Sequence, residues 1–219
     1  STCRICASTG GSTDQPAEAV AARNGTGEEP DPRRWALAHA ILAPNSHNRQ
    51  PWLVDLREPD AITLRVDLER TLPETDPWFR QIVISQGTFI EALVLALKER
   101  GLDPQVTLFP EGGFAPRTLD ARPVARVHWT PGAPVPPKDP LFAQLRRRHT
   151  AKVPYDTTRP VAPATLAQLA SVLQHTGVRT DSTVEAGPMA ALRELCWQSA
   201  QVELPTPRTV MESIALTRV

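Results

Sequence analysis

Apolar residues recur at helical spacing in two segments of the first half of the chain. They predict a helix that opens at Asp31-Pro32 and ends near Leu42, and a longer helix from about Trp78 to Arg100. Gly101 follows the longer helix as a C-terminal stop. The apolar positions of the longer helix share one face, which we assign to the core: Ile82, Phe89, Leu93 and Leu97.

Short runs of apolar and β-branched residues predict four strands around these helices. They cover residues 52–56, 62–66, 105–109 and 124–129. The first two runs are separated by a turn at Arg57–Asp60, in which Pro59 and Asp60 are typical turn formers. The pattern predicts an α+β fold over residues 30–130, with helices packed on a small mixed sheet.

The rest of the chain has a different pattern. Residues 131–138 are proline-rich and predict a linker. Residues 139–219 predict helices near 140–147, 163–175, 188–204 and 206–219 but no strand, so we expect an incomplete second module. Residues 1–29 are rich in small and polar residues and predict a disordered segment. That segment lacks the charged and apolar regions of a signal peptide, so none is expected.

Composition narrows the class of protein. The chain has 24 basic and 24 acidic residues, which gives no electrostatic reason to expect nucleic acid as a partner. No run reaches the roughly 18 apolar residues of a membrane helix, so no membrane segment is expected. Three cysteines do not make a disulfide framework, and Cys3 and Cys6 have no second pair with which to bind zinc.

The most informative polar stretch is Pro44-Asn45-Ser46-His47-Asn48-Arg49-Gln50-Pro51-Trp52, between the first predicted helix and strand. Its amide and hydroxyl groups offer donors and acceptors that can read the edge of a heterocycle. A loop held by flanking elements is a common place for a binding site. The alternative is an ordinary polar turn whose Asn side chains bond their own backbone.

A second candidate stretch, Arg146-Arg147-Arg148-His149-Thr150-Ala151-Lys152, follows the helix near 140–147. Cations in a last helical turn complement the helix dipole, which explains Arg146 and Arg147. The alternate spacing of Arg148, Thr150 and Lys152 places their donors on one side of an extended segment. Such a set suits a phosphate or an anionic ring.

The two stretches together resemble the FMN-dependent nitroreductase superfamily. The segment Arg148–Asp156 is similar to the family's opening motif, Arg-x-Ser-x-Arg/Lys, which grips the flavin. The segment Pro44–Trp52 is similar to the family's Pro-Ser-x-x-Asn-x-Gln-Pro-Trp loop, which contacts the flavin from the partner subunit. This chain has Asn45 where the family commonly has Ser, which keeps a polar group but changes its reach.

The order of the two motifs is inverted here, and each predicted module carries only one of them. This layout is similar to the Acg-type branch of the superfamily, in which two fused modules make a pseudo-dimer within one chain. The resemblance implies one complete site shared by both modules. The chain ends before a second module would be complete, so we expect that module to be truncated.

The resemblance implies an FMN-dependent oxidoreductase that passes hydride from NAD(P)H to a small-molecule acceptor such as a nitroaromatic or a quinone. No nucleophile or acid–base pair is needed, because the flavin carries the chemistry. The implied cofactor-binding residues are Asn45, Ser46, Asn48, Arg148, Thr150 and Lys152. Two alternatives stay open, a flavin-storing protein without turnover and a remnant that binds no flavin. A homo-oligomer also stays open.

Overall fold

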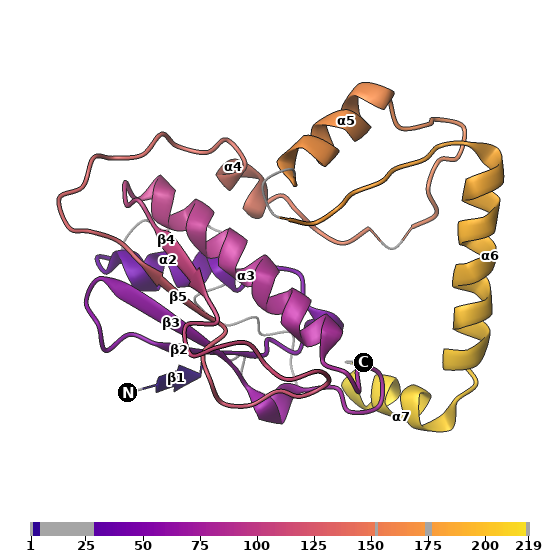
Figure 1. Ribbon diagram of the computed structural model, residues 1–219, viewed down its shortest axis with the longest axis horizontal. Helices are drawn as coiled ribbons and strands as arrows, with labels where there is room; N and C mark the ends of the chain where they lie inside the picture. The colour runs from indigo at the N-terminus through magenta and orange to yellow at the C-terminus, as the bar shows by residue number, and fades with distance from the viewer. Residues whose placement is uncertain (1, 5–28, 152, 174–176, 218–219) are drawn as a thin grey trace. The chain divides into compact units, whose positions relative to one another are not determined.

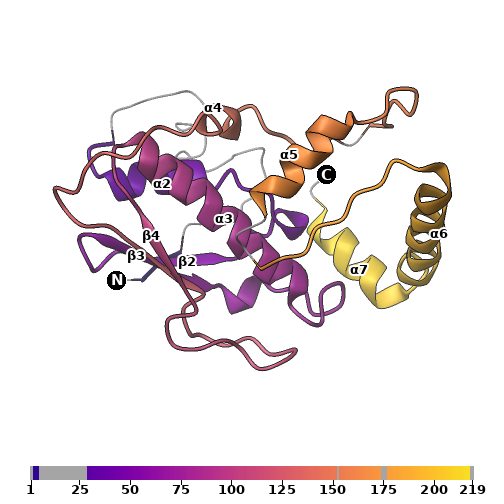
Figure 2. The same ribbon diagram turned by 45° about the horizontal axis from the view of Figure 1, so that its top comes forward.

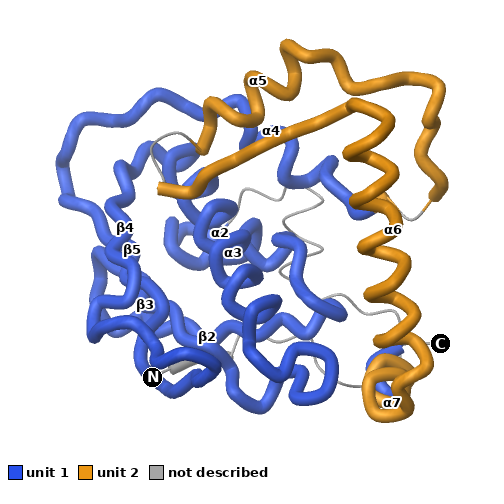
Figure 3. The backbone as a smooth tube through the Cα atoms, turned by 45° about the vertical axis from the view of Figure 1, so that its right-hand side comes forward, with its two compact units in different colours: residues 1–150, 215–219 blue, residues 151–214 orange. Residues whose placement is uncertain are grey.

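The computed structural model describes residues 2–4, 29–151, 153–173 and 177–217, in two compact units. Figure 3 colours them separately: unit 1 comprises residues 1–150 and 215–219, and unit 2 comprises residues 151–214. The division between the two units falls at 150/151, after the helix that follows the proline-rich segment.

A five-stranded sheet with the order β1-β2-β3-β5-β4 forms one layer of unit 1. Its strands are β1 (Thr2–Arg4), β2 (Trp52–Asp55), β3 (Ala61–Val66), β4 (Gln105–Leu108) and β5 (Ala125–His128). Every pairing is antiparallel, so the expected mixed sheet is wrong. The reason is β5, which takes the place between β3 and β4 and runs antiparallel to both.

The edge strand β1 lies within the segment that was expected to be disordered. It pairs with β2 in a register that places Cys3 opposite Val54. The four strands predicted from the sequence are confirmed as β2 to β5, with bounds that shift by at most one residue. Residues 5–28, with Cys6 among them, lie outside the described residues.

Helix α2 (Pro32–Ala40) begins where its sequence predicts. The Asp31 side chain caps it by accepting a hydrogen bond from the Arg33 N–H at 2.9 Å, and Pro32 occupies the first helical position. The Arg33 guanidinium returns to the same carboxylate and also donates to the carbonyls of Leu56 and Glu58. One arginine thus ties the start of α2 to the end of β2.

Helix α3 (Arg80–Glu99) crosses unit 1 beside α2 (Figures 1 and 2). It begins two residues later than predicted, because Phe79 adopts a left-handed conformation with φ 57°. It ends as predicted at Gly101, whose φ is 77°. The N–H of Leu102 bonds to the carbonyl of Leu97, and that of Gly101 to Lys98, which closes the helix in a Schellman motif.

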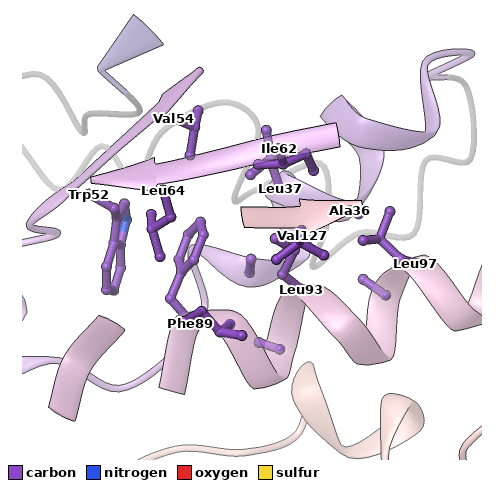
Figure 4. Close-up of a cluster of buried hydrophobic side chains, with 14 of the residues drawn as sticks. Ala36, Leu37, Trp52, Val54, Ile62, Leu64, Phe89, Leu93, Leu97 and Val127 are labelled. Atoms are coloured by element: carbon purple, nitrogen blue, oxygen red, sulfur yellow. The ribbon is translucent and has the colours of Figure 1, made fainter. Parts of the chain in front are cut away.

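The main core lies between the sheet and the two helices (Figure 4). The predicted core face of α3 is confirmed, since Ile82, Phe89, Leu93 and Leu97 are all fully buried. The Phe89 ring lies 4.7 Å from the Trp52 ring of β2, between centroids. Alternate residues of β3 face the same core, as the pleat requires. The burial of these aromatic and aliphatic side chains is the main contribution to the stability of unit 1.

Helix α4 (Phe142–Leu145) follows the proline-rich segment and belongs to unit 1. Its Phe142 ring stacks on Trp35 of α2 at 5.6 Å and lies 5.1 Å from the His39 ring. Phe142 and Leu145 both pack against the main core. This apolar contact explains why the first unit extends to residue 150 instead of ending at the linker.

Unit 2 consists of helices in its described part, as predicted. They are α5 (Pro163–Val172), α6 (Ala186–Glu203) and α7 (Pro207–Leu216), whose last two residues belong to unit 1. No strand occurs among residues 153–173 and 177–214. No apolar side chain of that part is fully buried, and Trp197 is 59% exposed.

Helix α3 is long and apolar enough to meet a length-and-composition criterion for a membrane span. Just over half of it, 56%, is buried within the protein. The core helix of a folded domain meets the same criterion, and the side chains that α3 buries are those of the core described above.

Candidate cofactor-binding site

The loop Pro44–Trp52 joins α2 to β2 and contains a short 3-10 turn, η1 (Ser46–Asn48). Three of its residues lie in the left-handed region, with φ 48° at His47, 50° at Asn48 and 53° at Gln50. Each such conformation costs a non-glycine residue about 1–2 kcal/mol. The loop therefore needs specific contacts to hold its shape, and strained backbone of this kind concentrates at functional sites.

Side chains of the loop supply many of those contacts. The Asn45 Oδ1 accepts a hydrogen bond from the Gln50 N–H at 2.8 Å, and its Nδ2 donates to the Ala43 carbonyl at 3.2 Å. The Gln50 Nε2 donates to the Ile41 carbonyl at 3.3 Å and to Asn48 Oδ1 at 2.9 Å. Asn45 therefore shapes the loop with both of its polar atoms, as the polar-turn alternative expects.

Four polar side chains of helix α3 form hydrogen bonds with the loop. Ser46 donates its N–H to Ser85 Oγ at 3.3 Å, and its hydroxyl donates to Gln81 Oε1 at 3.5 Å. Gln86 Nε2 donates to the Pro51 carbonyl, and Thr88 Oγ1 to the Pro44 carbonyl. Sequence reasoning missed these residues. Their signal was a set of polar positions inside an otherwise apolar helix: Gln81, Ser85, Gln86 and Thr88.

Asn48 and Ser46, unlike Asn45, keep hydrogen-bonding groups that a ligand can contact. Asn48 is exposed, and its Oδ1 accepts from Gln50 while its Nδ2 has no hydrogen-bond partner among the described residues. Ser46 is half-buried, with a single long hydroxyl bond. Asn48 can therefore still donate to a ligand through Nδ2, and the Ser46 hydroxyl oxygen can still accept, whereas both polar atoms of Asn45 bond within the loop.

The structure brings Arg148 to the residues that immediately precede this loop. Its Nη2 donates to the carbonyl of Leu42 at 3.0 Å, across a separation of 106 residues. Both residues belong to unit 1, so the contact lies within one compact body. The guanidinium is exposed and has four further N–H donors.

The other members of the second motif are placed less fully. Thr150 is exposed at the end of unit 1 and makes no hydrogen bond with a described residue. Lys152 lies outside the described residues. His149 bonds through Nδ1 to the Arg147 carbonyl at 3.1 Å, a local backbone contact. The structure thus places Asn45, Ser46 and Asn48 on one loop with Arg148 bonded two residues before it, and leaves the positions of Thr150 and Lys152 relative to a ligand to sequence reasoning.

The segment that carries Arg148 is anchored by the aromatic contacts of α4. Between α2 and α4, His39 is only 4% exposed and donates from Nδ1 to the Trp35 carbonyl at 2.9 Å. Burial lowers the pKa of His39 below its usual value of 6.5, and the charge of Arg146 lowers it further, against the opposing effect of the Trp35 carbonyl. A neutral imidazole therefore fits this contact, because a buried cation beside another cation is unfavourable.

The donor set fits the phosphate end of a flavin nucleotide. The consecutive guanidinium groups of Arg146, Arg147 and Arg148 are exposed, and none forms an ion pair with a carboxylate in the described part of the chain. Guanidinium forks match phosphate oxygens in geometry and charge. Residues 2–4, 29–151, 153–173 and 177–217 contain no group of three His, Cys, Asp or Glu side chains that could hold a metal ion.

Comparison with known proteins gives distant relatives. No family model matches the chain. A Mycobacterium tuberculosis (strain H37Rv) protein named "Putative NAD(P)H nitroreductase" is 29% identical over 145 residues, which is 66% of this chain and 40% of the relative. A second protein of that strain, named "Uncharacterized protein", is 31% identical over 127 residues, which is 56% of this chain and 35% of the relative.

The chain thus spans about 40% or less of the length of these curated relatives. The named relative supports an oxidoreductase-like protein at the level of the nitroreductase superfamily. The α+β architecture of unit 1, with helices on a small antiparallel sheet, is consistent with that class.

Proposed function

We propose that this chain binds FMN where the loop Pro44–Trp52 meets the segment that begins at Arg148. In this proposal the protein is an FMN-dependent oxidoreductase of the nitroreductase type. It takes hydride from NAD(P)H and delivers it to a small acceptor such as a nitroaromatic or a quinone. The observation that carries the proposal is the hydrogen bond from Arg148 to the Leu42 carbonyl, because it brings the second motif to a position two residues before the first, across 106 residues of sequence.

Arg148 and Thr150 hold the phosphate. The bond to Leu42 fixes the guanidinium at the entrance to the loop and leaves its other N–H groups free to pair with phosphate oxygens. The Thr150 hydroxyl adds a donor next to it in sequence. The resemblance to the nitroreductase superfamily assigns Lys152 to the pyrimidine edge of the ring, where a cation stabilises the negative charge of the reduced form.

The loop orients the ring. Asn48 Nδ2 is the donor that the loop leaves available and the Ser46 hydroxyl oxygen is an available acceptor, and the bonds from α3 keep their backbone in place before any ligand arrives. Preorganisation of this kind reduces the ordering cost of binding. Bound FMN supplies the hydride-transfer chemistry, so the polypeptide needs to supply binding and orientation.

Flavin retention in paired variants tests the site. Arg148→Ala removes the guanidinium beside Leu42, whereas Arg147→Ala removes the same charge one residue away without a side-chain bond to the loop. We expect Arg148→Ala to weaken FMN binding at least about tenfold, the effect of losing a charge-assisted pair. Arg147→Ala should weaken it at most about threefold. Equal effects of the two variants would contradict the assignment of Arg148.

A second pair tests the loop. Asn48→Asp keeps the oxygen that accepts from Gln50 but replaces the Nδ2 donor with an anionic oxygen, so we expect FMN binding to be lost while thermal stability stays close to wild type. Asn45→Ala removes two internal loop bonds and should lower the melting temperature as well. NAD(P)H oxidation by the flavin-loaded protein, with nitroaromatic and quinone acceptors, then separates an enzyme from a flavin-storing protein.

A further inference from the structure

A second candidate site lies on unit 1, in a pocket that shares α3 with the loop but no residue with it. The pocket has a volume of about 640 Å³ and opens to solvent. Three segments line it, namely residues 78–80 and 83–84 around the start of α3, Phe109 after β4, and residues 113–115 and 117–118 of the β4–β5 connection. The loop Pro44–Trp52 bonds instead to Gln81, Ser85, Gln86 and Thr88 of the same helix.

The walls of the pocket are aromatic and aliphatic. Phe109 and Phe114 meet edge to face at 5.7 Å and both pack against the smaller of the two cores of unit 1. On the open side, Trp78 is 47% exposed and Ile84 is 67% exposed. A volume within roughly 300–1,000 Å³ and a mainly apolar lining are typical of sites for small organic molecules.

Two arginine side chains lie beside Trp78 at the wall of the pocket. The Arg117 guanidinium lies 4.3 Å from the centre of the Trp78 ring, and that of Arg80 lies 5.5 Å from it. No carboxylate of the described residues forms an ion pair with either. The Trp78 indole ring thus contacts two guanidinium groups beside an apolar pocket, and it does not neutralise their positive charge. Charge complementarity therefore points to an anionic ligand.

The backbone of the pocket is strained in the same way as the loop Pro44–Trp52. Phe79, Phe109 and Arg117 have φ values of 57°, 47° and 60°. Among the described residues, every non-glycine position with positive φ lies either in that loop or in this pocket. Bulky side chains rarely adopt this conformation. Arg122 supports the strained connection by donating to the carbonyls of Glu111 and Gly112 and pairing with Asp120.

We infer that this pocket binds a small planar aromatic carboxylate, with its ring against Phe114 and Ile84 and its carboxylate at Arg117 and Arg80. A guanidinium fork matches a carboxylate in both charge and geometry. The apolar walls select an aromatic body over an inorganic anion, and the two cations select the anion over a neutral aromatic compound. The inference does not depend on FMN binding, because the pocket and the proposed flavin site have no residue in common.

Calorimetric titration with 2-naphthoate, and with neutral 2-naphthamide as the matched ligand, tests this site. We expect 2-naphthoate to bind with a stoichiometry of one and 2-naphthamide at least about tenfold more weakly, because it lacks the charge-assisted pairing. Arg117→Gln should weaken the binding of 2-naphthoate by a similar factor. Lys98→Gln, which removes one positive charge from the far end of α3, should leave it unchanged.

A further variant separates a loss of 2-naphthoate binding from a loss of folding. Ile84 is largely exposed, so Ile84→Glu should keep the melting temperature of the wild type while placing a carboxylate that repels the ligand. Loss of 2-naphthoate binding in this variant supports the inference. The inference is overturned if neither ligand binds, if both bind equally well, or if Arg117→Gln and Lys98→Gln bind 2-naphthoate alike.

Discussion

The network around Gln50 allows a sharp test of how the loop Pro44–Trp52 keeps its strained shape. Gln50→Glu is nearly isosteric, but it replaces the Nε2 donor with an oxygen. Two hydrogen bonds, to the Ile41 carbonyl at 3.3 Å and to Asn48 Oδ1 at 2.9 Å, become contacts between acceptors. The bond from Trp52 Nε1 to Gln50 Oε1, at 3.2 Å, is retained. The variant therefore removes the donor function of Gln50 and adds a negative charge that faces the same two acceptors.

The expected loss follows from those two bonds. A typical intramolecular hydrogen bond contributes about 0.5–1.5 kcal/mol, so the pair accounts for about 2 kcal/mol of the free energy of unfolding. For a domain of this size, that corresponds to a fall in melting temperature of about 4–8 °C. Thermal unfolding at pH 7, followed by circular dichroism, measures the fall.

A double-mutant cycle with Asn48→Ala separates the two contacts. Asn48→Ala removes one of the facing acceptors, so Gln50→Glu should cost less in that background than in the wild type. A Gln50→Glu protein that melts within about 1 °C of the wild type would refute the reasoning, since the lost bonds would then contribute almost nothing. Additive effects in the cycle would refute the specific contact between the two side chains.

Other predictions concern single residues. His47 is exposed with φ 48°, so His47→Gly should melt at or above the wild-type temperature while His47→Val melts below it, because a β-branched residue is strained there. Phe89 is fully buried, so Phe89→Ala should lower the free energy of unfolding by about 3–5 kcal/mol in urea titration. The pKa of His39 is lowered by burial, so the unfolded chain binds its proton more readily. Stability should therefore fall as the pH drops below about 6.5, and the melting temperature of His39→Phe should fall less than that of the wild type between pH 7.5 and 5.5.

The elements of unit 1 could be predicted because local signals and tertiary packing agree there. Asp31-Pro32 starts α2 and Gly101 ends α3, and both act through backbone groups that any helix leaves unpaired. The start of α3 was placed too early because Phe79 turns the chain into the left-handed region, which no residue type at that position signals. The order of the strands depends on long-range pairing of β5, and local periodicity does not contain that information.

The candidate site shows the same division between local and long-range information. The polar composition of Pro44–Trp52 and the cations after α4 were visible in the sequence. That Asn45 turns inward to its own loop, and that Arg148 reaches the carbonyl of Leu42, depends on contacts with Ala43, Gln50 and α4 that composition does not encode. The support from α3 was missed for a similar reason, since a polar residue in a helix does not show which loop it will meet.

The central claim is that one flavin phosphate lies at Arg148. The most direct measurement compares the dissociation constants of FMN and riboflavin for the chain, by flavin fluorescence, at low and at high salt. The proposal predicts that FMN binds with a stoichiometry of one and at least about tenfold more tightly than riboflavin, with a preference that shrinks as salt screens the charges. Equal affinities for the two flavins, or no binding of either, would contradict it.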